Sequence, residues 1–293
     1  MFGAFSAVRP DVFPTWVSIR SIIDLAAPVI VLAVGLTVVL NAGEFDLAFP
    51  GAAALVSVVT VQASASLNQW AVPILVGLVV GVVTGLIGGA LVAMRRAGSF
   101  IVTIALSAVW TALSFSLSHG GLTIPVHNET YLNVAFGRAL GIPFTVYYAA
   151  ALALAIYAML RWTVFGRYVR AIGSNPTATR LSGVNMSITR VGAFTVMGFC
   201  AAAAGVIITS RAGQYSPQLG GGLFIPPFVA VFFGTSVLGA RTFNVFGSVV
   251  GALFIGVLQS GLNILGASGW LGDGIIGVTL IVTLMLGTGR KAD

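Results

Sequence analysis

Nine long apolar blocks divide this chain and limit the class of fold that it can adopt. They lie at about 22–40, 49–66, 71–94, 100–118, 144–160, 190–210, 223–240, 245–265 and 269–287. A helix needs roughly 20 such residues to cross the hydrocarbon core of a bilayer. Only 7% of the residues are charged and the mean hydropathy is +1.04, whereas soluble domains contain about a quarter charged residues. The blocks lack the alternation of barrel strands. We therefore expect an all-α polytopic membrane protein of about nine transmembrane helices, one domain over residues 1–293.

The net charge of +7 is unevenly divided between the ends of these blocks. Alternating the ends between two sides puts ten basic residues on one side: Arg95, Arg96, Arg161, Arg167, Arg170, Arg180, Arg190, Arg241, Arg290 and Lys291. Four fall on the other side: Arg9, Arg20, Arg138 and Arg211. Because basic residues gather on the cytoplasmic side, we expect the loop 161–190 and the C-terminus to be cytoplasmic and the loop 119–143 to be external. This distribution accounts for the charge without a nucleic-acid partner.

Small residues recur at helical spacing and predict close helix packing. One stripe comprises Gly77, Gly81, Gly85 and Gly89. Two shorter ones follow, with Gly247 and Gly251 in the first and Ala252, Gly256 and Ser260 in the second. Such stripes let helix backbones approach closely in lipid. A short similarity links residues 42–55 (AGEFDLAFPGAAAL) and 212–225 (AGQYSPQLGGGLFI). In the predicted topology these two segments begin on opposite sides of the membrane. It suggests an inverted repeat of four plus four helices, as many transporters have.

Motifs for catalysis or metal binding give little support to an enzyme. The chain has no HExxH and no GxxxxGK[ST] phosphate loop, which are the usual signatures of zinc peptidases and NTPases. The stretch GASG at 266–269 fits a rhomboid protease motif, but such a serine needs a histidine from a later helix. His119 and His127 come much earlier, so Ser268 is interpreted as a turn residue. Cys200, the single cysteine, lies inside an apolar block and is interpreted as a packing residue.

Acidic residues inside the membrane would indicate coupling to an ion gradient. Glu44 and Asp46 lie just before a helix start, where carboxylates complement the helix dipole. Asp24 and Asp273 lie near the outer ends of blocks. An ion-coupled secondary transporter is thus the alternative function, although no acid lies clearly at the centre of a block.

Uncharged polar residues within the blocks are candidates for a solute pathway, because hydroxylated solutes need hydrogen-bonding groups. Equally, such side chains often bond their own helix or a neighbouring one. The candidates are Thr37, Asn41, Thr103, Ser107, Trp110, Gln259 and Asn263.

The segment 166–190 (GRYVRAIGSNPTATRLSGVNMSITR) interrupts the apolar character with a short amphipathic helix. Asn175 is a strong N-cap residue, Pro176 suits the first helical position, and Gly183 suits a left-handed C-cap. The apolar residues Ala178 and Leu181 share one face, with Val184 just beyond. A helix this short must dock on something to be stable. The residues leave two interpretations open: a loop that binds lipid headgroups through its arginines, or a docking helix for a soluble partner.

This segment resembles the cytoplasmic loop of sugar-type ABC importer permeases, the ribose and related monosaccharide permeases of the branched-chain amino acid/sugar permease superfamily. The matching residues are Gly166-Arg167-Tyr168, Ala171-Ile172-Gly173 with Asn175, and 178–184 (ATRLSGV). Further matches occur at 43–51 (GEFDLAFPG), 98–106 (GSFIVTIAL) and 232–266, so that the resemblance covers about residues 12–289.

The resemblance implies a permease subunit of an ATP-driven importer in the bacterial cytoplasmic membrane, for a monosaccharide or related polyol. A second permease, identical or homologous, a cytoplasmic ABC ATPase and a periplasmic or lipid-anchored sugar-binding protein are the implied partners. ATP and Mg²⁺ would bind the ATPase, and no cofactor is expected on this chain. The implied coupling helix comprises Gly173, Asn175, Pro176, Thr177, Ala178, Thr179, Arg180, Leu181, Ser182, Gly183 and Val184.

The chain departs from the family pattern at three places. The family usually has ten membrane helices, whereas residues 1–20 cannot supply one before the first block, so that either the recorded start is internal or this member has nine spans. Glu44, Phe45, Ala48, Phe49 and Pro50 replace smaller or different family residues, and Phe233 stands at a usual glycine. If these positions line the pathway, the solute differs from ribose.

Overall fold

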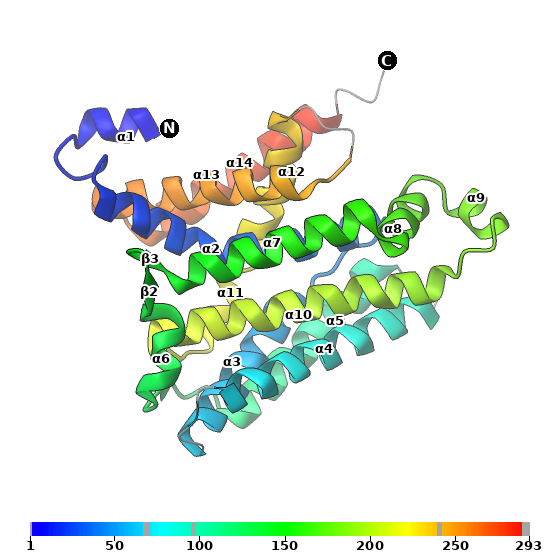
Figure 1. The fold of residues 1–293 in the computed structure, drawn as a ribbon, viewed down its shortest axis with the longest axis horizontal. Coiled ribbons are helices and arrows are strands. Elements are labelled where there is room, and N and C mark those ends of the chain that lie inside the picture. The colour runs from blue at the N-terminus through cyan, green and yellow to red at the C-terminus, as the bar shows by residue number, and fades with distance from the viewer. Residues whose placement is uncertain (1, 67–68, 70, 95–97, 239–241, 289–293) are drawn as a thin grey trace.

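The computed structural model describes residues 2–66, 69, 71–94, 98–238 and 242–288, and this part of the chain is almost entirely helical (Figure 1). All nine apolar blocks form helices, as predicted, and the first of them begins at Trp16 rather than near residue 22. These nine are α2 (Trp16–Asn41), α3 (Phe49–Ser66), α4 (Ala71–Met94), α5 (Ser99–Leu117), α7 (Phe144–Trp162), α10 (Met186–Ala212), α12 (Ile225–Val237), α13 (Val245–Ile264) and α14 (Gly269–Thr288). Short helices stand between or before them: α1 (Phe2–Val8), α6 (Glu129–Phe136), α8 (Val164–Ser174), α9 (Pro176–Leu181) and α11 (Gln218–Gly221).

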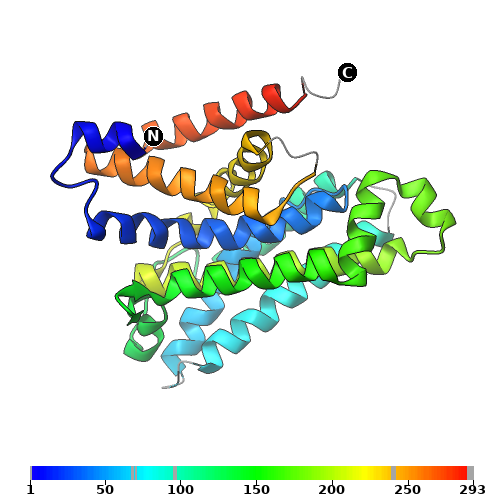
Figure 2. The same cartoon turned by 45° about the horizontal axis from the view of Figure 1, so that its top comes forward.

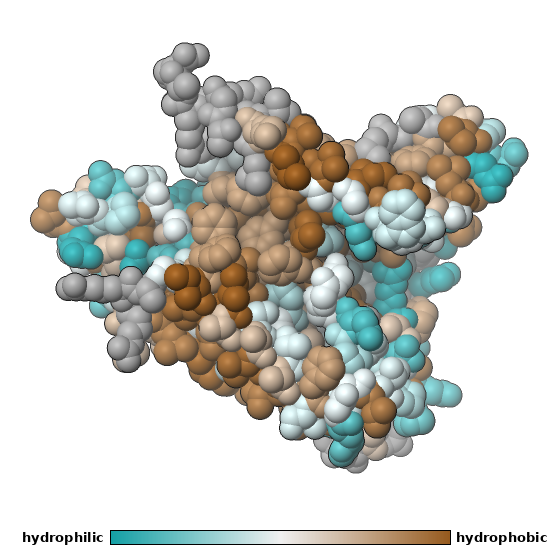
Figure 3. All heavy atoms as spheres, turned by 180° about the vertical axis from the view of Figure 1, so that it is seen from behind, coloured by the Kyte–Doolittle hydropathy of each residue, from teal (hydrophilic) through white to brown (hydrophobic). Residues whose placement is uncertain are grey.

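The surface has the pattern expected for a membrane-embedded bundle. Six of the described helices are long and apolar enough to cross a bilayer, and α3, α12 and α14 contain shorter apolar stretches. In Figure 3 hydrophobic residues cover the middle of the molecule and hydrophilic residues gather toward two opposite ends. The predicted cytoplasmic residues Arg95, Arg96, Arg241, Arg290 and Lys291 lie outside the described residues. The structure is therefore that of an all-α polytopic membrane protein.

Two sets of four helices pack in the same pattern. The first set is α2, α3, α4 and α5, and the second is α10, α12, α13 and α14, so that α2 and α10 are the leading helices. In the first set α3 packs on α4 and α5, and in the second set α12 packs on α13 and α14. The leading helix of each set packs on the other set: α2 contacts α12 and α13, whereas α10 contacts α3 and α4. The leading helices also contact one another and run in opposite directions (Figures 1 and 2). This exchange supports the predicted inverted 4+4 repeat.

The sequence similarity between the two halves coincides with the ends of these leading helices. Gly43 follows α2 and Gly213 follows α10, and both adopt left-handed backbone angles, with φ of 76° and 66°. Glycine takes this conformation without the penalty that a Cβ atom would add. Beyond this point the halves differ, because α3 begins six residues after Gly43 whereas β4 and α11 precede α12.

The glycine stripes bring helix backbones into direct contact, as predicted. Gly81 and Gly85 of α4 face Gly198 of α10, and Gly247 of α13 faces Gly234 of α12. In each case an added Cβ would meet the backbone of the opposite helix. Dispersion between closely packed backbones therefore holds the bundle together where burial from water cannot.

The loop 119–143 is an ordered cap, which the sequence did not predict. It contains α6, the strand β1 (Ile124–Pro125), which pairs antiparallel with β4 (Gln214–Tyr215), and a hairpin of β2 (Arg138–Ala139) and β3 (Ile142–Pro143). The buried hydroxyl of Tyr131 lies 2.8 Å from that of Thr209 on α10. These long-range contacts fix the loop to the end of α10.

Candidate coupling segment and solute pathway

The segment between α7 and α10 begins with a tight corner. The Thr163 side chain ends α7 by donating to the Met159 carbonyl (2.6 Å) and caps α8 by accepting from the Gly166 amide (3.2 Å). A Cβ added at Gly166 would lie 2.5 Å from Leu160 Cα, so only glycine fits. Val169 and Ile172 bury the inner face of α8 against the bundle. The corner therefore sets the direction in which the chain leaves α7.

Helix α9 has the caps expected from its sequence. The Asn175 side chain accepts a hydrogen bond from the Ala178 amide (3.0 Å), and Pro176 occupies the first turn. Gly183 ends the segment with φ of 78°. Thr179 is buried and donates to the Asn175 carbonyl (2.8 Å). The helix is thus held in shape by its own caps rather than by a large core.

The apolar outer side of α9 is uncovered. Leu181 is 85% exposed, and Ala178 is exposed with it, whereas Val184 is half-buried. Figure 1 shows α9 as the outermost element at its end of the molecule, carried between α8 and α10. The outward side of α9 thus consists of Leu181 and Ala178, on a helix whose two ends are capped.

Helix α8 rests directly on the end of α2. A Cβ added at Gly173 would collide with the Asn41 carbonyl oxygen and lie 3.3 Å from the Gly43 amide nitrogen, so the backbones of the two segments are in close contact. The residues after α2 form the α2–α3 connection, residues 42–48. Glu44 in this connection forms an ion pair of 2.7 Å with Arg190 at the start of α10. The connection is therefore clamped between α8 and α10.

The same connection contacts α5 on its other side. The Phe45 amide donates to the Ser99 hydroxyl (3.0 Å) at the start of α5. Asp46 turns the chain into α3, because its carboxylate accepts from the Ala48 amide (2.7 Å). One short segment thus joins α8, α10, α3 and α5, and any displacement of α8 relative to α2 must act on it.

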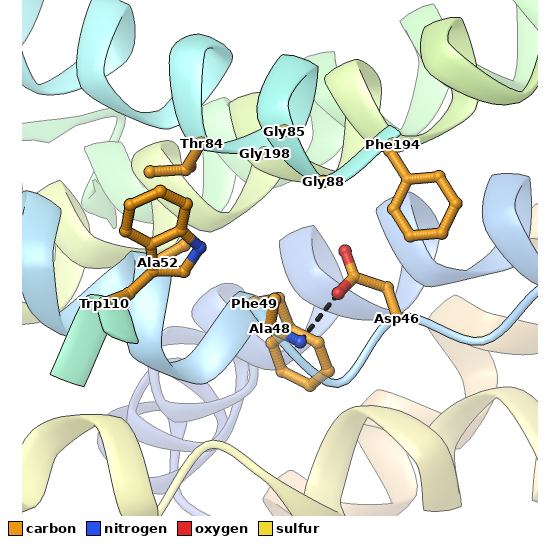
Figure 4. Close-up of a pocket in the computed structure, with 10 residues that line it drawn as sticks. All are labelled: Asp46, Ala48, Phe49, Ala52, Thr84, Gly85, Gly88, Trp110, Phe194 and Gly198. Atoms are coloured by element: carbon orange, nitrogen blue, oxygen red, sulfur yellow. Dashed lines mark hydrogen bonds between the residues drawn. The ribbon is translucent and has the colours of Figure 1, made fainter. Parts of the chain in front are cut away.

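Asp46 and Trp110 face a small buried cavity (Figure 4). The Asp46 carboxylate and the indole nitrogen of Trp110 both turn toward the space between α3, α4, α5 and α10. The Trp110 nitrogen is buried without a hydrogen-bond partner among the described residues. The cavity has a volume of about 10 Å³, which is roughly the room that one water needs. It is too small for a sugar.

A larger groove opens along the exposed side of α5. Its volume is about 630 Å³. Both hydroxyls in its lining, those of Ser107 and Thr111, come from α5, one helical turn apart. The groove is lined by Leu47, Ile104, Ser107, Ala108, Thr111, Ala112, Phe115 and Phe224. It is a surface on which a hydroxylated solute can find both hydrogen bonds and apolar contact.

The predicted pathway residues do not lie together. Ser107 lines the groove, and Trp110 lines the small cavity next to it. Thr37 is buried between α2 and α13, where its hydroxyl lies 2.6 Å from that of Ser248. The Asn41 amide donates to the Phe243 carbonyl (2.8 Å), and Thr103 donates to its own helix at Ser99 (2.8 Å).

The remaining two candidates, Gln259 and Asn263, lie on α13, where Gln259 is half-buried and Asn263 is exposed. Their part in a pathway stays a prediction, as does that of the other five.

Three features of this region go beyond the sequence predictions. Asp46, predicted only to complement a helix dipole, faces the small cavity, Thr111 lines the groove, and residues 164–174 form the separate helix α8. Val169 and Ile172, three residues apart beside arginines, are a periodic signal that indicates α8. The contact between Glu44 and Arg190 has no local signal, because 146 positions separate them.

Comparison with known proteins identifies the family. The model of the branched-chain amino acid transport system permease component matches residues 18–284, nearly the whole chain. The chain belongs to this family of membrane permeases. The predicted resemblance to importer permeases is thereby confirmed, and the ion-coupled alternative is not favoured.

Individual relatives are sugar permeases. The ribose import permease protein RbsC of Escherichia coli is 28% identical over 292 residues, covering 98% of this chain and 90% of that protein. The RbsC protein of Haemophilus influenzae is 30% identical over 278 residues (92% and 84%). The D-allose transport system permease protein AlsC of E. coli is 26% identical over 263 residues (89% and 80%). No solved structure matches the chain.

Proposed function

We propose that this chain is the membrane-spanning permease subunit of an ATP-driven importer for a monosaccharide or related polyol. The observation that carries the proposal is α9: a capped helix that presents Leu181 away from the bundle, in a chain of the permease family. The named relatives that import ribose and allose support a sugar as the solute.

In this proposal α9 is the coupling helix and rests on a cytoplasmic ABC ATPase. The hydrophobic side chain of Leu181 inserts into the ATPase surface, and α8 passes the movement to the α2–α3 connection through Gly173. The ion pair between Glu44 and Arg190 makes that connection move together with α10. The contact of Phe45 with Ser99 then carries the movement to α5.

The groove on α5 is the part of the chain that we assign to the solute. Its hydroxyls at Ser107 and Thr111 bind sugar hydroxyls, and Leu47 and Ile104 contact the apolar ring faces. A second permease, identical or homologous, closes the open side of the groove. A periplasmic or lipid-anchored binding protein delivers the sugar to the end that carries the loop 119–143.

In this proposal the ATPase subunit hydrolyses ATP. ATP and Mg²⁺ bind the ATPase subunit, and this chain contributes movement of helices rather than a chemical step. The protein resides in the bacterial cytoplasmic membrane, with the loop 161–190 and the C-terminus in the cytoplasm. The excess of arginine in that loop supports this orientation.

The test is co-purification of the ATPase from gently solubilised native membranes. Leu181→Asp places a charge on the proposed docking face, whereas Leu122→Asp makes the same change at a 61% exposed leucine of the loop 119–143. We expect an ATPase in stoichiometric amount with the wild type and with Leu122→Asp, and its loss from Leu181→Asp. If no ATPase accompanies the folded wild-type protein, the proposed function is wrong.

A further inference from the structure

The corner between α7 and α8 exposes large apolar side chains that nothing in the described structure covers. Trp162 is 72% exposed and Val164 is 48% exposed, at the end of α7 and the start of α8. Tyr168 follows one turn later on the same face of α8 as Val164, and it is exposed as well. Exposed tryptophan and tyrosine at a helix end are typical of a membrane–water interface.

Two arginines flank these side chains. Arg161 precedes Trp162 and Arg167 precedes Tyr168, and both are exposed. They are near one another, because Leu160 and Gly166, the residues before them, have backbones in contact. Among the described residues the ion pairs are Arg190–Glu44 and Arg211–Asp24, which leaves both of these arginines without a carboxylate. The corner is therefore a basic surface whose two charges no described carboxylate neutralises.

The corner also continues the exposed side of α7. Tyr157, one turn before Arg161, is 45% exposed, and its ring lies 6.2 Å from that of Trp162 in an edge-to-face contact. Leu154 of the same helix is exposed too. This is the side of a membrane helix that contacts lipid chains. The arginines therefore lie at the level of the lipid headgroups, at the membrane–water interface.

We infer that the α7–α8 corner binds the headgroup of an anionic phospholipid of the inner leaflet. Arg161 and Arg167 bind the phosphate, since guanidinium groups pair with phosphate oxygens through parallel hydrogen bonds. Trp162 and Tyr168 pack beside the glycerol and the upper acyl chain. Because α8 leads directly into α9, the bound lipid fixes the base from which the coupling helix projects.

The test uses the assembled transporter in vesicles that contain brominated phosphatidylglycerol or brominated phosphatidylcholine, whose bromine atoms quench nearby tryptophan. The difference between wild type and Trp162→Phe isolates the emission of Trp162. We expect this emission to be quenched more strongly by brominated phosphatidylglycerol than by brominated phosphatidylcholine. Arg161→Gln and Arg167→Gln should each lower the preference about fivefold, the effect of one basic residue near an anionic surface.

Arg138→Gln is the matched control, because Arg138 is an exposed arginine of the loop 119–143. It should leave the preference unchanged. Equal quenching by the two lipids would show an interfacial anchor without a phosphate site and would overturn the inference. Absence of quenching by either lipid would also overturn it, because a protein surface, such as the ATPase, would then cover the corner. Neither result bears on whether the chain imports sugar.

Discussion

Replacement of Gly198 by alanine tests whether α4 and α10 are held by backbone contact. The new Cβ would lie 2.8 Å from Gly85 Cα and closer still to the carbonyl oxygen of Gly81. Carbon atoms pack best at about 3.5–4.0 Å, so the helices must separate by roughly 1 Å. Overpacking costs about 1–3 kcal/mol. Because both obstacles are backbone, which no side-chain rotation can move, we expect a loss near 3 kcal/mol.

Helix propensity works in the opposite direction but is too small to prevail. Exchange of a helical glycine for alanine gains at most about 1 kcal/mol. Gly88→Ala on α4 provides the matched control, because its Cβ would meet Leu106 Cδ1 at 3.6 Å and Phe194 Cδ1 at 3.9 Å, both ordinary contacts. It should keep or slightly raise the stability of the protein.

The assay is unfolding of the purified protein in mixed micelles with increasing detergent denaturant, followed by the helical circular dichroism signal. Gly198→Ala should unfold at a clearly lower denaturant fraction than wild type, and Gly88→Ala should not. If Gly198→Ala is as stable as Gly88→Ala, the helices are not in the backbone contact that the structure describes, and the packing argument fails.

Four further substitutions test the coupling route and the groove on α5. Glu44→Arg and Arg190→Glu should each lower ATP-driven uptake, and the double exchange should recover part of the uptake. Measured on the free energy of unfolding, a double-mutant cycle should give a coupling free energy of about 1–3 kcal/mol. Additive effects of the two single substitutions would contradict the ion pair. Asn175→Ala removes the α9 cap and should cost about 1 kcal/mol of helix stability, seen as weaker ATPase binding by the solubilised permease; unchanged affinity would show that the cap is dispensable. Ser107→Leu should reduce uptake while the ATPase still co-purifies, and wild-type uptake would remove Ser107 from the pathway.

The parts of the fold that depend on local sequence were predictable. Runs of apolar residues determine where helices form in a bilayer, and the caps of α9 at Asn175 and Gly183 lie within a few residues of the backbone groups that they satisfy. The glycine stripe of α4 likewise indicated a close contact, although not that its partner is α10. A periodic pattern reveals a face but not what covers it.

The candidate site was less predictable, because it depends on contacts between distant segments. Thr37 and Ser107 look alike in sequence, yet the Thr37 hydroxyl lies against that of Ser248 in the core, whereas Ser107 lines an open groove. The position of Gly173 against the end of α2 follows from how α8 folds back, which no local motif encodes. Burial and partners, rather than residue type, separate structural hydroxyls from those available to a solute.

Uptake of sugar by the purified transporter in sealed vesicles tests the central claim most directly. The vesicles would hold the permease with its ATPase, and labelled ribose or allose would be offered with the binding protein, with ATP and Mg²⁺ supplied on the ATPase side. We predict uptake that requires ATP and persists when ionophores abolish proton and sodium gradients. Uptake without ATP, driven by an imposed ion gradient, would contradict the account and establish an ion-coupled transporter in its place.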